Sequence, residues 1–150
     1  MVTKQQYWML LALQEAQSAA AKGAWPCGAV IVQGDQLIAK GQNAVALIPD
    51  ATAHAEIQVI RRGCQRLQSR NLAGTHLYTT AEPCPMCIAA CVWASISKVY
   101  YGVSITDLMQ LGERQIALTS QEIVEKAFHK VELVGGLLRQ ECLDLYKHDR

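Results

Sequence analysis

The segment LYTTAEPCPMC occupies residues 77–87 and carries the turn from a predicted strand into a predicted helix. The strand is expected over residues 75–80. Pro83 and Pro85 then mark a loop that opens a helix, which is expected to run from residue 84 to about residue 94. A strand that leads through a short loop into a helix is typical of a layered α/β domain.

Outward from this segment, strands and helices continue to alternate. Further helices are expected over 4–22, 53–64, near 107, over 120–127 and over 137–146, and further strands over 28–33, 36–39, 98–101 and 130–134. Gly34 and Asp35 make a hairpin of the strands that flank them. Thr52 is expected to cap the helix that begins at Ala53, and residues 41–50 are expected to form a loop. The pattern predicts an α/β domain with a mostly parallel sheet and a hairpin at one side.

The composition is that of one folded domain. The chain has 150 residues, of which 51% are hydrophobic and 18% are charged, and these values exclude a disordered tail. The formal net charge is only +1, which argues against a strongly basic nucleic-acid binder. No apolar run is long enough to span a membrane. We therefore expect residues 1–150 to form a single domain with no membrane partner.

The cysteines and the N-terminus indicate a reducing, cytoplasmic setting. The apolar run over 7–13 loosely resembles a signal peptide, but Gln14 and Glu15 interrupt it and the pattern continues at helical period. Of the six cysteines, Cys84 and Cys87 form a Cys-x-x-Cys pair, and the others lie in apolar or helical patterns. Metal binding or burial therefore explains them better than disulfides.

Two short segments carry the residues suited to chemistry. His54, Cys84 and Cys87 offer one imidazole and two thiolates, a donor set that suits zinc. Three protein ligands leave one position for water, as in a catalytic site, whereas a fourth ligand such as Cys91 would close a structural site. Burial in the core is the preferred interpretation of Cys91. Glu56, two residues after His54, can take a proton from a metal-bound water and return it.

The arrangement H-x-E followed by P-C-x-x-C is the signature of zinc nucleobase deaminases. On these motifs, the chain resembles the cytidine-deaminase-like superfamily over about residues 3–105, and especially its guanine and cytosine deaminases and its bacterial tRNA adenosine deaminases. The resemblance implies a three-layer α/β/α fold with a central mixed five-stranded sheet. It also implies one Zn²⁺ per chain, held by His54, Cys84 and Cys87, with Glu56 as the proton shuttle. The implied reaction is hydrolytic deamination, which releases ammonia.

The resemblance extends to the residues that would bind substrate. It assigns Asn43 to a hydrogen bond with the substrate ring and the backbone N–H of Ala55 to a ring carbonyl or nitrogen. Trp93 is assigned either to the border of the pocket or to the core. Gln115 stands where guanine deaminases carry an acidic residue, and an amide both donates and accepts hydrogen bonds. Cys27 departs from the aromatic residue that is common in guanine deaminases.

The substrate is the least determined feature. The low net charge, the mixed charges of residues 137–150 and the lack of a basic tail favour a free nucleobase or a related aminated heterocycle. The exact ring stays open. The basic stretch Arg61, Arg62, Arg66 and Arg70 is interpreted as a solvated helix face. The alternatives are a tRNA adenosine deaminase and a non-catalytic module stabilised by zinc. Because the family commonly forms dimers, the resemblance also implies a homodimer.

Overall fold

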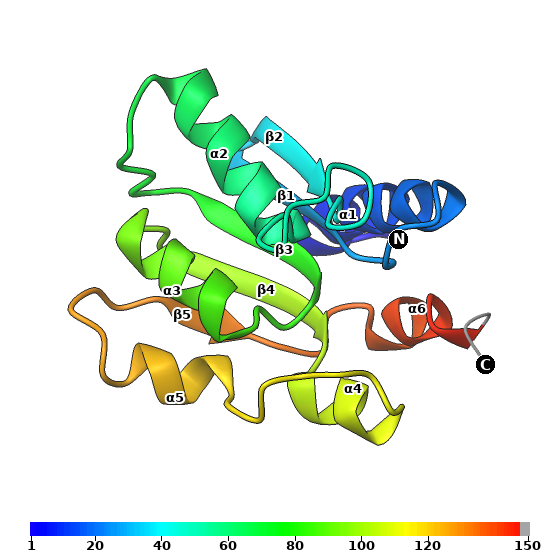
Figure 1. Ribbon diagram of the computed structural model, residues 1–150. Coiled ribbons are helices and arrows are strands. Elements are labelled where there is room, and N and C mark those ends of the chain that lie inside the picture. The colour runs from blue at the N-terminus through cyan, green and yellow to red at the C-terminus, as the bar shows by residue number, and fades with distance from the viewer. Residues whose placement is uncertain (148–150) are drawn as a thin grey trace.

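The centre of the molecule is a five-stranded sheet of mixed direction, seen in the computed structural model, which describes residues 1–147 (Figure 1). The strands are β1 (Gly28–Gln33), β2 (Gln36–Gln42), β3 (His76–Ala81), β4 (Lys98–Val103) and β5 (Glu132–Val134), in the order β2-β1-β3-β4-β5. The mixed sheet implied by the resemblance is confirmed. The expected hairpin, β1 and β2, lies at one side of the sheet, and its strand β1 is the one that runs against the other four, antiparallel to both of its neighbours. Only the pairings of β4 with β3 and β5 are parallel.

Helices cover both faces of this sheet. They are α1 (Lys4–Ala21), α2 (Ala55–Leu67), α3 (Pro85–Trp93), α4 (Ile105–Gln110), α5 (Ser120–Val124) and α6 (Arg139–Asp144). A side chain at Gly28 would collide with Ala12 of α1, and one at Gly102 would collide with Cys142 of α6. The strand registers place these two glycines on one face and Gly41, which packs on α2, on the other. Figure 1 shows α2 and α3 together on the near face. The three-layer α/β/α arrangement is therefore confirmed.

Two element boundaries near the site differ from those predicted. Strand β2 continues to Gln42, where a loop was expected from residue 41, because Gly41 pairs with Ala29 across the sheet. Helix α2 begins at Ala55 with His54 as its N-cap, whereas Thr52 was expected to cap it. The hydroxyl and the backbone N–H of Thr52 instead donate to Asp50, so Thr52 closes a local turn before the helix.

The C-terminal elements are shorter than predicted. Helix α5 ends at Val124, β5 spans three residues and α6 spans Arg139–Asp144. Leu138, which precedes α6, has a φ of 51° and so lies in the left-handed region, where the helix cannot extend backwards. The tail residues His148, Asp149 and Arg150 lie outside the described residues.

The basic stretch of α2 has a role in the fold. Arg62 donates to the carbonyl oxygen of Lys40 at 2.7 Å, and Arg66 donates to the carbonyl oxygen of Ile38 at 3.0 Å. Both carbonyls belong to β2, which is an edge strand of the sheet. These contacts satisfy carbonyl groups on an edge that would otherwise be open to another strand.

The cysteines are unpaired and mostly buried, as expected from the sequence. All six cysteines are free thiols, and Cys27, Cys91 and Cys142 are buried. Within residues 1–147, no helix combines the length and apolar character needed to cross a membrane.

Candidate metal and substrate site

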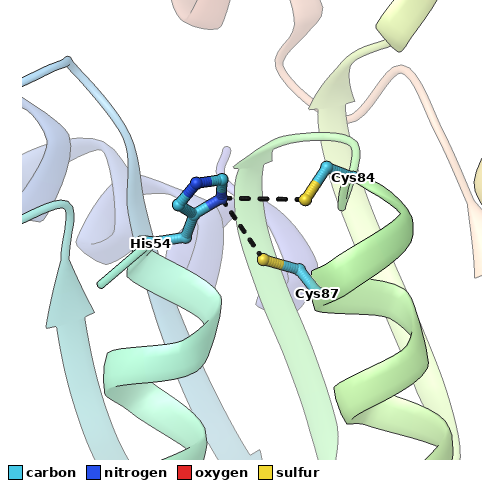
Figure 2. Close-up of side chains that lie close together, drawn as sticks. All are labelled: His54, Cys84 and Cys87. Atoms are coloured by element: carbon cyan, nitrogen blue, oxygen red, sulfur yellow. Dashed lines mark hydrogen bonds between the residues drawn. The ribbon is translucent and has the colours of Figure 1, made fainter. Parts of the chain in front are cut away.

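Three of the predicted ligands lie together where two helices begin. Figure 2 shows the ring of His54 facing the sulfurs of Cys84 and Cys87. The His54 Nδ1 atom lies 3.7 Å from the Cys84 sulfur and 3.5 Å from the Cys87 sulfur. All three donor atoms lie within 4.8 Å of one another. The structure therefore brings a nitrogen donor together with two sulfur donors that follow it by 30 and 33 residues in the chain.

The local fold explains this convergence. His54 is the N-cap of α2, and Cys84 is the N-cap of α3. Neither side chain caps its own helix, so both are free to point toward the space between the helices. Pro85 at the first position of α3 starts that helix directly after Cys84, which places Cys87 in the first turn. The free N–H groups at helix N-termini favour negative charge, and this stabilises thiolates here.

The ionisation of the three donors is strongly coupled. The pKa of Cys84 is lowered to about 4, because its sulfur accepts a hydrogen bond from Cys87 and a second from His54. The same pairing, together with burial, raises the pKa of the Cys87 thiol. The pKa of His54 is raised, chiefly by its hydrogen bond with Cys84. One sulfur in this group is therefore already a thiolate at neutral pH.

The donor set fits a zinc ion. A partly buried imidazole at the start of α2 and two thiol groups at the start of α3 are the ligand types that zinc sites use. Cys91 is fully buried and is not part of the group of three. With three protein ligands, one side of the group stays open toward the adjoining pocket, as in catalytic zinc sites.

Glu56 lies beside the donors on the second residue of α2. Its side chain is only 3% exposed, although it carries a carboxyl group. Burial raises the pKa of Glu56 to about 7, and the negative charge of Cys84 adds to this rise. A carboxyl group with this pKa exchanges protons readily at neutral pH, which suits general acid and base catalysis.

A small pocket adjoins the donors. Its walls come from six segments of the chain: Trp25, Cys27, Asn43, His54, Glu56, Ala81, Glu82, Cys84, Leu108 and Gln115. It continues into a wider cleft lined by Val45, Ala46, Glu113 and Arg114 together with Trp25, Asn43, His54 and Gln115. The pocket lining thus combines polar side chains with one aromatic side chain, that of Trp25.

The structure brings two of the four predicted substrate-binding residues, Asn43 and Gln115, to this pocket, whereas Ala55 is buried and does not line it. Asn43 is 5% exposed and lines the pocket, and its side-chain oxygen accepts the N–H of Val45, which leaves the amide NH₂ available as a donor. Gln115 lines both the pocket and the cleft. Ala55 is the first residue of α2, so its N–H has no partner within the helix.

Trp93 is not at the site. It is the last residue of α3, is 76% exposed and contacts the Phe128 ring, with 4.9 Å between the centroids. Both sequence-based assignments of Trp93, to the pocket border and to the core, therefore need correction. Residue 93 lies two turns after the helix start, so it is carried away from the donors along the helix.

Two further pocket residues were missed from the sequence. Trp25 lies before β1, and its indole N–H donates to Glu113 at 3.3 Å. Glu82 directly precedes the Pro-Cys motif and is 6% exposed. An acidic residue inside an otherwise uncharged segment was the available signal for Glu82, whereas nothing in the sequence links Trp25 to residues nearly 90 positions later.

Comparison with known proteins follows the same motifs. Residues 2–103 match the family described as "Cytidine and deoxycytidylate deaminase zinc-binding region". A tRNA-specific adenosine deaminase of Agrobacterium fabrum is 47% identical over 96 residues, which cover 64% of this chain and 63% of that protein. A tRNA-specific adenosine deaminase of Bacillus subtilis is 36% identical over 141 residues, which cover 94% of this chain and 85% of that protein. The match thus spans just under two thirds of the first relative and most of the second.

A solved structure gives the same result in three dimensions. It comes from a study of A-to-I editing by tRNA:A34 deaminases at the wobble position of transfer RNA. Its TM-score is 0.83 at 35% identity, and the match covers 93% of this chain and 98% of that chain.

These relatives overturn the expected substrate. The sequence favoured a free nucleobase, but relatives that match this chain at 47% and 44% identity over 64% of it, or at 34% and 36% over more than nine tenths of it, are named tRNA-specific adenosine deaminase. A guanine deaminase of Bacillus subtilis is 46% identical, over only 58% of this chain and 56% of its own length. The preference for a guanine-type or cytosine-type substrate is therefore wrong.

Proposed function

Because the chain belongs to the cytidine and deoxycytidylate deaminase zinc-binding family, we propose that it is a zinc-dependent deaminase that converts an adenosine of transfer RNA to inosine. The membership confirms the resemblance drawn from the two motifs. We further propose that residues 1–150 act as one catalytic domain. The observation that carries the proposal is that two of the three clustered donors, His54 and Cys84, line one pocket with the buried Glu56 and with Asn43 and Gln115.

The chemistry of the pocket suits hydrolytic deamination. When bound by His54, Cys84 and Cys87, zinc supplies the Lewis acidity that makes water a nucleophile at neutral pH. Glu56 takes the proton of the attacking water and delivers it to N1 of the adenine ring. A bond forms between oxygen and C6, and the bond from C6 to the amino nitrogen then breaks. Glu56 takes the remaining proton of the added water and delivers it to the departing amino nitrogen. Water and adenosine thus yield inosine and ammonia.

The other pocket residues suit a purine ring. The amide NH₂ of Asn43 donates to a ring nitrogen, and Gln115 offers both a donor and an acceptor. The indole of Trp25 in the pocket lining presents an aromatic face on which a base can stack. The pocket therefore holds the base by its edges and by one face, as enzymes that act on an extruded nucleotide require.

The wider cleft supplies a contact for the RNA backbone. Arg114 lines it, is exposed, and has no ion-pair partner among residues 1–147. The net charge of +1 misled the choice of substrate because it sums the whole chain. Phosphate binding depends on cations beside the site, and two of the arginines counted in that sum, Arg62 and Arg66, satisfy backbone carbonyls of β2 instead.

The direct test is inosine formation in RNA. The zinc-loaded protein is incubated with a transfer RNA that carries adenosine at the wobble position, and nucleosides are quantified after nuclease digestion. Inosine is expected with the natural protein, and Glu56→Ala is expected to lower the rate by about 10²–10⁴-fold with zinc retained. Glu125→Ala, an exposed carboxylate outside the site, is the matched control and is expected to be fully active.

Two outcomes would contradict the proposal. Ammonia release from free bases alone would exclude RNA editing. If the zinc-loaded natural protein forms no inosine, and the Glu56→Ala variant gives the same result, the protein would instead be a non-catalytic zinc module.

We also propose a homodimer. Trp93 and Phe128 are 76% and 71% exposed and pack against each other on the surface beside α3. Two large aromatic side chains that face solvent together are typical of a protein interface. A second copy of this chain is the partner that the family membership favours.

A further inference from the structure

Cys27 is the only cysteine of residues 1–147 that lies in the pocket without belonging to the donor group. Its sulfur lies 3.8 Å from Glu56 Oε1, and this contact joins the segment before β1 to helix α2. The side chain is 3% exposed. The mechanism described above makes no use of this thiol.

The surroundings of Cys27 direct its proton toward Glu56. The hydroxyl of Thr80 lies 3.7 Å from the sulfur and donates to it. The same hydroxyl oxygen accepts the N–H of Gly28 at 3.2 Å, so Thr80 is held in place from the other side. Since the sulfur already accepts one hydrogen bond, its own S–H is left to donate to the carboxylate. Burial raises the pKa of Cys27 well above its usual value, so the thiol keeps its proton.

The backbone of Cys27 is equally well fixed. Its N–H donates to the carbonyl oxygen of Trp25 at 2.8 Å, and its carbonyl oxygen accepts the N–H of Asn43 at 3.0 Å. Both partners line the pocket. The thiol is therefore presented from a rigid point, whereas the side chain of Glu56 has three rotatable bonds that must be ordered.

We propose that Cys27 is a positioning residue that donates a hydrogen bond to Glu56 Oε1 and so aims the other carboxylate oxygen at the reacting atoms. This inference rests on the proposed function, because Glu56 is the group that moves protons in that reaction. A precisely aimed carboxylate matters because small displacements of an acid or base lower the rate steeply. The competing explanation is that Cys27 only fills space in the pocket wall.

A series of substitutions separates the two explanations. Cys27→Val keeps an apolar side chain of similar size but removes the donor, Cys27→Ser keeps a donor, and Cys27→Ala removes both size and donor. A net hydrogen bond of about 0.5–1.5 kcal/mol corresponds to roughly a 2- to 10-fold change in rate. We expect Val and Ala to lower kcat by that factor with KM within about 2-fold, and Ser to restore at least half of the natural kcat. Cys142→Ala removes a buried thiol with no contact to Glu56 and is the matched control.

A second measurement does not depend on activity. The S–H stretching band of Cys27, isolated as the infrared difference between the zinc-loaded natural protein and its Cys27→Ala variant, is expected at the lower frequency of a hydrogen-bonded thiol. Glu56→Ala is expected to shift this band upward. Failure of the natural protein to edit RNA would overturn the proposed function, and the band would still report the hydrogen bond.

Three results would overturn the role of Cys27. The first is an S–H stretching band of Cys27 whose frequency is unchanged in Glu56→Ala. The second is a Val variant with the natural kcat. The third is a Ser variant no better than Ala.

Discussion

The carboxylate of Glu82 accepts a hydrogen bond from the backbone N–H of Ser120 at 2.7 Å, across 38 positions of sequence. Its other oxygen accepts the N–H of Ile105 at 2.9 Å. These are the first residues of α5 and α4, so one buried side chain holds the starts of two helices. The hydroxyl of Ser120 returns a hydrogen bond to the carbonyl oxygen of Pro83, next to the ligand Cys84. The segment that carries Gln115 is thereby tied to the loop that leads into Cys84.

Replacing Glu82 with glutamine is expected to destabilise the protein by about 1–3 kcal/mol. Glutamine has one acceptor oxygen, so its NH₂ group would face a second backbone N–H. Urea unfolding of the zinc-loaded protein measures the change, with Glu125→Gln as the exposed control. An unchanged free energy of unfolding would show that the two helix starts do not depend on this carboxylate.

Removing a metal ligand is expected to abolish zinc binding. Cys84→Ser and Cys87→Ala are each expected to lower the zinc content from one ion per chain toward zero, because only three protein donors hold the ion. Elemental analysis after gel filtration measures this. Cys91→Ala is the control, and a loss of zinc in that variant would reveal a fourth ligand and a closed site.

Arg114→Ala is expected to weaken the binding of transfer RNA and to lower the slope of log affinity against log salt by about 1. Without the Arg114 cation at the cleft, the protein would neutralise one phosphate fewer, so one counterion fewer would be released when the RNA binds. Fluorescence anisotropy at several salt concentrations gives both values. Arg70→Ala, an exposed arginine outside the cleft, should leave both unchanged, and an equal loss there would indicate non-specific binding.

Trp93→Ser is expected to convert a dimer into monomers, because it removes one ring of the exposed aromatic pair. Light scattering after gel filtration measures the molar mass over a range of concentrations. Tyr7→Ser removes an aromatic side chain of α1 that is 52% exposed and should leave the mass unchanged. A natural protein that is monomeric throughout would contradict the dimer itself.

The ion pair of Asp107 with Arg139 predicts a pH dependence of stability. Arg139 donates to both carboxylate oxygens of Asp107, at 2.8 and 3.1 Å, and these bonds lower the pKa of Asp107 to about 2. A lowered pKa adds stability that is complete above the unfolded value near 4 and is lost as the pH falls toward 2.

The natural protein is therefore expected to be more stable than Asp107→Asn at pH 6, by an amount on the order of 1 kcal/mol. This difference should shrink as the pH falls from 5 to 2. Urea unfolding of both metal-free proteins across this range measures it. A difference that stays constant would show that the pair does not contribute.

Much of the fold was predictable because its signals are local. The strand β1 was predicted at its observed bounds, since a β-branched run between turn residues is read from neighbours in sequence. The start of α2 was not, because the hydroxyl of Thr52 can cap a helix or close a turn. Only its contact with Asp50 decides between them.

The sequence by itself determined which residues are candidates for the chemistry of this protein. His54, Cys84, Cys87 and Glu56 are identified by residue type and short spacing, and both motifs lie at helix starts whatever surrounds them. The tertiary structure alone decided what encloses that chemistry. It brings Trp25, Cys27, Glu82 and Arg114 to one site and sends Trp93 to the surface. The physical reason is distance along the chain. Contacts between remote residues depend on how the sheet orders its strands, and neither composition nor net charge records that order.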